Sequence, residues 1–496
     1  MTSTDLAAPL RDALDAADFR YDAVAALLGD AAHQALSRNE TAPARRRTGE
    51  DGSPLSTLIR LFLLQEAVER EAAEAALPGL VDRLGAAGIL LTGVGEVAAR
   101  LDCRPYATAE GDDLWVVSDL TPGLDGSPTN VSGDYVLGIS QASSSLAQLT
   151  LREDVGTALD LGTGCGVQAL HLAAHSDHVV GTDVNARALA IARFNAALNE
   201  LDDKIEIRDG SFFEPVADQR FDLIATNPPF VISPATGERL VYRDSGLPGD
   251  RVVEHIVRTA PRHLNDGGWC QILANWVIEE GRGWDERLSG WLPEDCDAFV
   301  VQREILDPAA YVELWLKDSG HHPSTGAGST ADYLRRYDTW LSWLTDQGVA
   351  GIGFGWINLH RSGRSGAPRT ELVEWPYDVE QPIAPAIGAW ARQRAAAAQV
   401  SEQDHLRVRV DVIQETQGPV GAEDPSTIVL RQQHGFRRAR RADTVTAAVV
   451  GACDGDLSVG QILDAVADLL ARDPASLREV YLPEIAELVA EGFLER

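Results

Sequence analysis

From about residue 150 the chain alternates short apolar runs with helical segments, and this alternation restricts the possible folds more than any other feature. Such a pattern predicts a parallel β-sheet covered by helices on both faces. The predicted strands cover residues 157–160, 178–183, 204–208, 221–226, 268–274, 298–303 and 349–358. We therefore expect an α/β fold built on a seven-stranded, doubly wound sheet.

A glycine-rich turn follows the first predicted strand and reads Asp160-Leu161-Gly162-Thr163-Gly164-Cys165-Gly166. Glycines let the backbone turn tightly and approach a ligand, and the helix that begins near Val167 adds free N–H donors. The second strand ends at Asp183, whose carboxylate can accept hydrogen bonds from a ribose diol. Both features follow strands at their carboxyl ends, where open α/β sheets bind ligands. They predict a cofactor site, with a ligand-free strand–helix turn as the alternative.

A second motif, Asn227-Pro228-Pro229-Phe230, directly follows the fourth predicted strand. In a sheet of this type the fourth strand lies beside the first, so the tetrad should lie beside the glycine turn. Two prolines fix the backbone and leave carbonyl groups free. The Asn227 side-chain oxygen and the next carbonyl can accept both hydrogens of an NH₂ group, while Phe230 can stack on a flat amide or base. The pair of motifs therefore favours group transfer to a planar nitrogen, which a dinucleotide site does not require.

The segment from Asp160 to Phe230 resembles the seven-stranded S-adenosylmethionine-dependent methyltransferases that modify planar amino groups. These include the release-factor glutamine N5 enzymes and the ribosomal-RNA guanine N2 and adenine N6 enzymes. The resemblance implies that Asp160 and the three glycines line the methionine portion of S-adenosylmethionine and that Asp183 binds the ribose. It implies a catalytic role for the tetrad Asn227, Pro228, Pro229 and Phe230.

The resemblance also identifies a departure after the third strand. Related enzymes often place an Asp there to reach the adenine amino group, whereas this chain has Ser211 at the matching position. Asp209 or a backbone N–H can substitute for the missing carboxylate. The cofactor-binding candidates are therefore Asp160, Gly162, Thr163, Gly164, Gly166, Asp183, Val184, Asp209, Gly210 and Ser211.

The regions on either side of the predicted sheet have a different pattern. Residues 1–125 combine several helices with two β-like runs, 97–106 and 114–117, and residues 385–496 again mix strands and helices. Both regions predict winged-helix-like α+β modules, which serve nucleic-acid binding, protein docking and scaffolding alike. We expect three domains: 1–125, a methyltransferase domain at 131–370, and 385–496.

Charge and cysteine content bear on the partner and the compartment. The chain carries 43 basic and 75 acidic residues, a net charge of −32, which repels polyanions at long range. Arginine clusters near residues 45–47, 361–369 and 437–441 offer local basic patches all the same. Five dispersed cysteines fit a reducing cytoplasm, and no apolar run reaches the ~18 residues of a membrane span. We expect a cytoplasmic protein without a membrane partner.

The acceptor of the methyl group stays open at this point. The winged-helix-like flanks, Phe230 and the arginine clusters favour an exocyclic amine of a ribosomal-RNA or other nucleic-acid base, and we lean to that interpretation. The acidic charge and the likeness to the release-factor enzymes favour a protein glutamine. A non-catalytic regulator that only senses S-adenosylmethionine, and an NAD-linked oxidoreductase, are less favoured alternatives.

Several residues near the two motifs are further candidates. Tyr135 and the serines at 143–145 precede the first strand and could cover the cofactor. Gly249-Asp250 could belong to a substrate lid, together with residues 242–246, and Asn275-Trp276 could line the same crevice. His171 and His175 share a helix face, but no acid lies between them as in a zinc-protease motif, so we expect no metal site.

Overall fold

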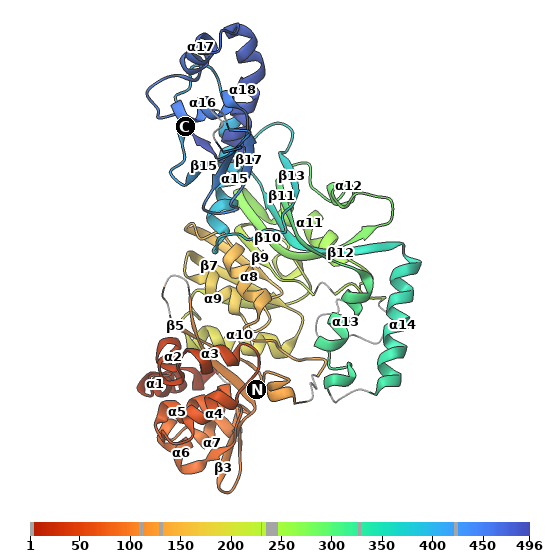
Figure 1. Cartoon of the computed structure of the whole chain (residues 1–496). Coiled ribbons are helices and arrows are strands. Elements are labelled where there is room, and N and C mark those ends of the chain that lie inside the picture. The colour runs from red at the N-terminus through yellow and green to blue at the C-terminus, as the bar shows by residue number, and fades with distance from the viewer. Residues whose placement is uncertain are drawn as a thin grey trace. The chain divides into compact units, whose positions relative to one another are not determined.

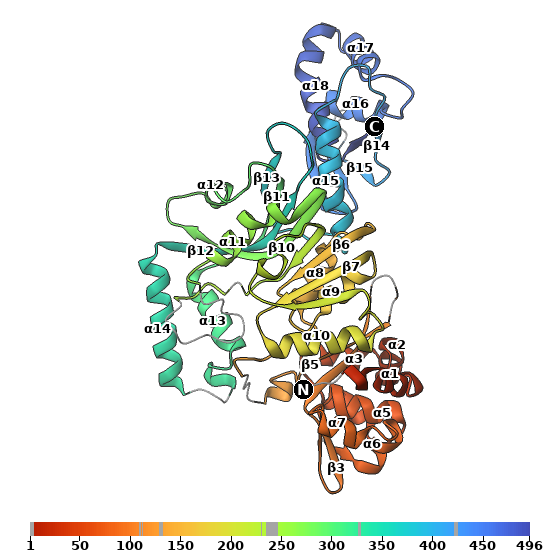
Figure 2. The ribbon, with the colours of Figure 1, turned by 180° about the vertical axis from the view of Figure 1, so that it is seen from behind.

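The computed structural model describes residues 4–108, 111, 113–127, 132–229, 231–234, 247–325, 329–420 and 425–496. The chain divides into two compact units (Figures 1 and 2). Unit 1 comprises Met1–Ala147 and Arg152–Trp375, and unit 2 comprises Gln148–Leu151 and Pro376–Arg496. Within the described residues, no helix has both the length and the hydropathy needed to cross a membrane.

Unit 1 is organised around an eight-stranded sheet with the order β13-β11-β12-β10-β9-β6-β7-β8. Its strands are β6 (Val155–Leu161), β7 (Ser176–Asp183), β8 (Ile205–Asp209), β9 (Phe221–Thr226), β10 (Leu264–Glu279), β11 (Asp297–Leu306), β12 (Val349–His360) and β13 (Thr370–Glu374). Five neighbouring strands, in the order β10-β9-β6-β7-β8, are parallel to one another, while β12 runs antiparallel to both its neighbours. All seven predicted strands are present, and the prediction missed the edge strand β13.

The sheet register brings the two sequence motifs together. Strand β9 pairs in parallel with β6, so that Leu161 is opposite Thr226. The glycine turn and Asn227 therefore leave the same edge of the sheet from neighbouring strands. The Thr226 hydroxyl donates a 2.7 Å hydrogen bond to the Leu161 carbonyl and so fastens the two strand ends.

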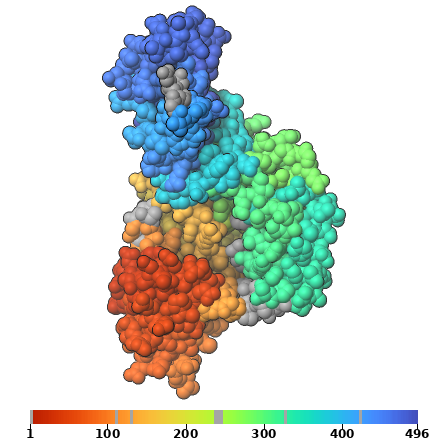
Figure 3. Space-filling view, viewed as in Figure 1, coloured from red at the N-terminus to blue at the C-terminus, as the bar shows by residue number. Residues whose placement is uncertain are grey.

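Helices pack around this sheet because each presents an apolar face to it. The α-helices that follow β5 are α8 (Gln141–Leu149), whose last two residues belong to unit 2, and, in unit 1, α9 (Val167–Ala173), α10 (Ala186–Leu198), α11 (Arg251–Thr259), α12 (Trp284–Ser289), α13 (Pro308–Asp318) and α14 (Thr330–Asp346). Helix α11 buries Val252, Val253, Ile256 and Val257 in the core beneath the sheet. Helices α13 and α14 lie between β11 and β12 in the chain and form part of the surface in Figure 3.

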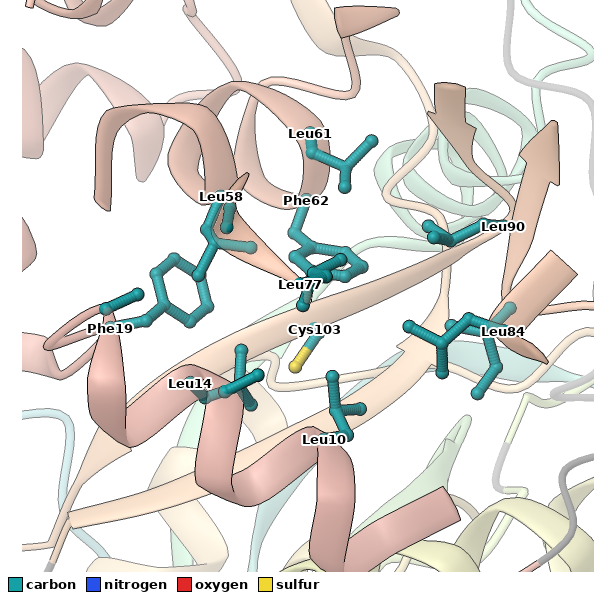
Figure 4. Packing of buried hydrophobic residues seen from close by; sticks show 14 of the residues in the cluster. Leu10, Leu14, Phe19, Leu58, Leu61, Phe62, Leu77, Leu84, Leu90 and Cys103 are labelled. Atoms are coloured by element: carbon teal, nitrogen blue, oxygen red, sulfur yellow. The ribbon is translucent and has the colours of Figure 1, made fainter. Parts of the chain in front are cut away.

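The first 120 residues form a helical region with two small antiparallel sheets, β1-β3-β2 and β4-β5. Its strands are β1 (Val68–Glu69), β2 (Leu90–Thr92), β3 (Glu96–Ala99), β4 (Leu101–Ala107) and β5 (Asp113–Asp119), and its helices are α1 (Ala7–Ala16), α2 (Tyr21–Leu28), α3 (Asp30–Leu36), α4 (Ala42–Thr48), α5 (Pro54–Leu58), α6 (Arg70–Ala76) and α7 (Val81–Ala86). Figure 4 shows the core of this region, where Leu10 and Leu14 of α1 meet Phe62 and Cys103.

The run predicted as one strand at 97–106 is two strands with different partners, because β3 pairs with β1 and β2 whereas β4 pairs with β5. The winged-helix character of this region stays a prediction. Short 3₁₀ or π turns complete unit 1 at Thr4–Leu6, Ile59–Leu63, Leu124–Gly126, Glu214–Val216, Ala260–His263 and Pro323–Thr325.

Unit 2 has its own hydrophobic core, to which Leu463, Leu488 and Phe493 contribute fully buried side chains. Its elements are α15 (Ala384–Ala397), β14 (Arg407–Val408), β15 (Val412–Gln417), β16 (Thr427–Gln432), β17 (Ala439–Ala442), α16 (Thr444–Ala452), α17 (Val459–Leu469), α18 (Pro474–Ala490) and β18 (Leu494–Glu495). The strands form a three-stranded sheet, β15-β16-β17, and the pair β14-β18. The mixture of strands and helices is as predicted, and the winged-helix assignment again stays a prediction.

Candidate active site

A cavity of about 600 Å³ opens at the carboxyl ends of β6, β7, β8 and β9. Loop residues 133–138, the start of α8 and the turns after the four strands line it. Its size and its position at the carboxyl edge of a parallel sheet are typical of small-molecule sites in such folds.

Most residues predicted from the sequence line this cavity. They are Asp160, Gly162, Thr163, Gly164, Asp183, Val184, Gly210, Ser211, Asn227, Pro228 and Pro229. Gly166 and Asp209 do not line it, and Asp209 is exposed beside it. Phe230 and residues 242–246 lie outside the described part of the chain.

The glycine turn adopts a backbone that L side chains rarely reach. Gly162, Gly164 and Gly166 have φ angles of 77°, 57° and 87°. A Cβ on Gly162 or Gly164 would meet nothing within 4 Å, so these two glycines are required for conformation and leave the cavity open. A Cβ on Gly166 would lie 3.2 Å from that of Ala192, so this glycine allows α9 and α10 to pack closely.

Two carboxylates hold the turn in this shape. Asp183 accepts a 2.9 Å hydrogen bond from the Gly164 N–H and a 2.8 Å bond from the Asn185 N–H. Asp160 is buried and accepts bonds from the Thr163 hydroxyl at 2.5 Å and the Ala169 N–H at 3.0 Å. Burial raises the pKa of Asp160 to about 7, because the hydrogen bonds only partly offset the loss of solvent. A cationic ammonium beside Asp160 would stabilise its charged form.

Asn227 carries an unpaired acceptor at the edge of the cavity. Its Oδ1 atom is buried and has no hydrogen-bond partner among the residues that the structure describes. Leaving a buried acceptor unpaired costs about 1–3 kcal/mol, so native proteins seldom do so without a functional reason. Asn227 is therefore suited to accept an N–H from a bound ligand.

Gln168 is a second polar side chain with an unpaired atom, and the sequence analysis missed it. It lies on α9, lines the cavity and is 5% exposed. Its Nε2 donates a 2.6 Å hydrogen bond to the Ser143 carbonyl of α8, while its Oε1 is buried without a partner among the described residues. A glutamine inside the apolar run that follows the glycine turn was the available signal.

Further residues that line the cavity come from the segment before β6 and from the turn after β8. Of the four residues proposed to cover the cofactor, Tyr135 and Ser143 line the cavity and Ser144 and Ser145 do not, while Leu137, Gly138 and Phe212 also line it. Phe212 has a φ of 47° and lies edge-on to His255, with 5.1 Å between the ring centroids. No local sequence pattern marks Phe212 as a lining residue.

Other candidate residues near the motifs are buried and do not line the cavity. Asp250, which precedes α11, is buried and forms a two-pronged ion pair with Arg287, at 2.7 and 2.9 Å; its place in a substrate lid stays a prediction. Asn275 and Trp276 are fully buried away from the cavity, where Asn275 donates to the Tyr311 hydroxyl. Within the described residues, no cluster of three His, Cys, Asp or Glu side chains could hold a metal ion.

Several arginines of the proposed basic patches have acidic partners. The ion pairs are Arg45–Glu66, Arg361–Asp266, Arg364–Asp297 and Arg440–Glu491, with nitrogen–oxygen distances between 2.7 and 3.2 Å. These carboxylates reduce the positive potential that the arginines present to a polyanion. The patches therefore give less support to nucleic-acid binding than the sequence suggested.

Comparison with known families agrees with this geometry. Residues 137–282 match the family model described as Methyltransferase small domain, and residues 16–100 match one described as Domain of unknown function (DUF7059). The cavity lies mostly within the first match, since its lining runs from Gly133 to Ile256.

Two curated relatives are similar to part of the chain. The release factor glutamine methyltransferase of Geobacter sulfurreducens is 35% identical over 157 residues, which cover 29% of this chain and 52% of the relative. The ribosomal protein uL3 glutamine methyltransferase of Bradyrhizobium diazoefficiens is 36% identical over 136 residues, 25% of this chain and 40% of the relative. The chain thus spans about half the length, or less, of these relatives.

Among solved structures, the ribosomal protein L11 methylase from Lactobacillus delbrueckii subsp. bulgaricus is 22% identical, with a TM-score of 0.21, and covers 27% of this chain and 59% of that one. This TM-score is too low for a structural conclusion. The family match and the curated relatives show that part of this chain, including residues 137–282, is similar to methyltransferases.

Proposed function

We propose that this protein transfers a methyl group from S-adenosylmethionine to the side-chain amide nitrogen of a glutamine in a protein. The single observation that carries the proposal is the buried, unpaired Oδ1 of Asn227, at the cavity edge beside the glycine turn. A carboxamide NH₂ group supplies the donor that this oxygen lacks.

The cavity suits the cofactor. Asp183 follows β7 with a carboxylate free to accept further hydrogen bonds from a ribose, since each of its oxygens retains acceptor capacity. Asp160 and the Oε1 of Gln168 offer acceptors for an ammonium group. S-adenosylmethionine bound in the cavity supplies a methyl group on a sulfonium and leaves as S-adenosylhomocysteine.

The protein residues position the acceptor nitrogen. Asn227 Oδ1 and the carbonyl of Pro228 accept the two N–H groups, which turns the nitrogen lone pair toward the cofactor. Pro228 and Pro229 stiffen this segment, and we assign Phe230 to stacking on the flat amide. As the carbon–nitrogen bond forms, positive charge develops on the nitrogen and the two acceptors stabilise it. The nitrogen then loses one proton to water, so no strong base is needed.

The relatives favour a protein substrate over the nucleic-acid base to which the sequence analysis leaned. Both curated relatives are named glutamine methyltransferases, one of a release factor and one of a ribosomal protein. The net charge of −32 and the acidic partners of the arginines also disfavour a polyanion. A release factor or ribosomal protein is therefore the substrate class that we propose.

Incubation with methyl-labelled S-adenosylmethionine tests the proposal. Release factors, ribosomal proteins and protein-free ribosomal RNA are offered separately, with and without the full-length chain. We expect label on a glutamine of a protein, located by mass spectrometry of its peptides. Label that enters only RNA would redirect the proposal to a base amine, and binding of the cofactor without any transfer would favour the sensor.

A further inference from the structure

Two asparagines, Asn195 in α10 and Asn199 at its C-terminal cap, bind the edge of β5 as a neighbouring strand would. Asn195 accepts a 2.8 Å hydrogen bond from the Val117 N–H and donates a 2.8 Å bond to the Val117 carbonyl. One turn later, Asn199 accepts from the Trp115 N–H at 2.9 Å and donates to the Trp115 carbonyl at 2.8 Å. These side-chain amides fix β5, which precedes the methyltransferase match, against a helix of the central sheet (Figures 1 and 2).

Asn195 also contacts the glycine turn that follows β6. Its Nδ2 donates a 2.8 Å hydrogen bond to the carbonyl of Cys165, which lies between Gly164 and Gly166 and lines the cavity. The Asn195 side chain is fully buried. Asn199 lacks this contact, because its Nδ2 donates instead to the Asn195 carbonyl. A single amide thus connects β5 to one wall of the cavity.

The end of β5 binds a second residue of the cavity lining, Val136. Asp119 accepts a 2.7 Å hydrogen bond from the Val136 N–H, and its own N–H donates to the Val136 carbonyl at 3.1 Å. The guanidinium of Arg187, on α10, binds the same carboxylate through its Nε at 3.1 Å. The loop of residues 133–138 also packs closely on β5, because a Cβ on Gly138 would be 2.4 Å from the Ser118 hydroxyl oxygen.

We propose that β5 contributes to cofactor binding. Asn195 and Asp119 are the positioning residues through which β5 affects the affinity for the cofactor. Neither side chain lines the cavity, so each acts through a wall residue, Cys165 or Val136. The inference rests on the proposed function for the identity of the cofactor. It gives the region before the methyltransferase match a role in cofactor binding in addition to any role in substrate docking.

Calorimetric titration of the full-length chain with S-adenosylhomocysteine tests the coupling in matched pairs of variants. Asn195→Leu and Asn199→Leu both remove the pairing with β5, but only the first removes the bond to the glycine turn. We expect Asn195→Leu to weaken binding about tenfold more than Asn199→Leu, because a buried carbonyl loses its donor. Thermal unfolding monitored by circular dichroism measures the structural cost that the two variants share.

A second pair keeps the test decisive if Asn195→Leu fails to fold. Asp119→Asn keeps an acceptor for Val136 but loses the charge that Arg187 binds, and we expect it to weaken binding about threefold to tenfold. Asp102→Asn is its control, because Asp102 is also buried and its hydrogen-bond partners, Arg104 and Thr121, do not line the cavity. Folded variants that bind as tightly as their controls would overturn the inference alone. A wild-type chain that binds no S-adenosylhomocysteine would overturn the proposed function as well.

Discussion

Replacing Asn227 with leucine should lower the methyl-transfer activity but leave the stability of the fold unchanged or raise it. Leucine has nearly the shape of asparagine but no polar atoms. In the folded chain it removes a buried Oδ1 that has no partner among the described residues. Since an unpaired buried acceptor costs about 1–3 kcal/mol, we expect the unfolding free energy of Asn227→Leu to stay unchanged or to rise by about 1 kcal/mol.

Activity should fall in the same variant. In the proposed reaction the Asn227 oxygen accepts an N–H from a nitrogen that gains positive charge in the transition state, and such a bond contributes about 1.5–3 kcal/mol. Its loss lowers kcat by about 10- to 150-fold. The Kd of S-adenosylhomocysteine should stay unchanged, because Asn227 binds the acceptor and not the cofactor.

Three measurements on one preparation check this combination. Thermal unfolding gives the stability, titration gives the cofactor affinity and single-turnover transfer of labelled methyl gives the rate. The reasoning would be refuted if Asn227→Leu lost stability and cofactor affinity together with activity, since Asn227 would then be a structural residue. It would be refuted equally if transfer proceeded at the wild-type rate.

Three further predictions concern the cofactor side of the cavity. Gln168→Met, which removes the buried Oε1, should weaken S-adenosylhomocysteine binding about tenfold in titration but leave methylthioadenosine, which lacks the ammonium group, unaffected. Gly166→Ala should lower the thermal unfolding midpoint more than Gly164→Ala, because both have positive φ but only the first meets a neighbour, at 3.2 Å; equal shifts would contradict this. Because burial raises the pKa of Asp160 from its usual 3.8 to about 7, the folded chain binds a proton that the unfolded chain has released across that range, and stability falls as the pH rises through it. Asp160→Asn should remove this component. The unfolding free energies of the wild type and the variant, measured by denaturant titration at several pH values, should therefore depend differently on pH, and a parallel dependence would contradict the prediction.

Most strands of the sheet could be predicted because they contain runs of buried apolar residues, whereas the apolar residues of β8 alternate with polar ones. Strand β13 could not, since it pairs only with β11 and all its side chains are at least partly exposed. The run at 97–106 was misassigned as one strand because propensity does not reveal that β3 and β4 take different partners. Pairing partners far apart in sequence leave no local signal.

Part of the candidate site could likewise be predicted from the sequence, and part could not. The glycine turn and the Asn227 segment were visible because they require special backbones beside predicted strands. The contributions of Asn195 and Asp119 were not, because each depends on contacts with residues distant in the chain, such as Val117 and Arg187. The basic patches were overestimated because their acidic partners, including Asp266 and Asp297, come from other segments.

Transfer of labelled methyl from S-adenosylmethionine to a purified release factor or ribosomal protein, with the modified residue located by peptide mass spectrometry, tests the central claim most directly. The account predicts one added methyl group on a glutamine side-chain nitrogen with the wild-type chain, and at least tenfold slower transfer with Asn227→Leu. Label found only in RNA, or equal transfer by the two chains, would contradict it.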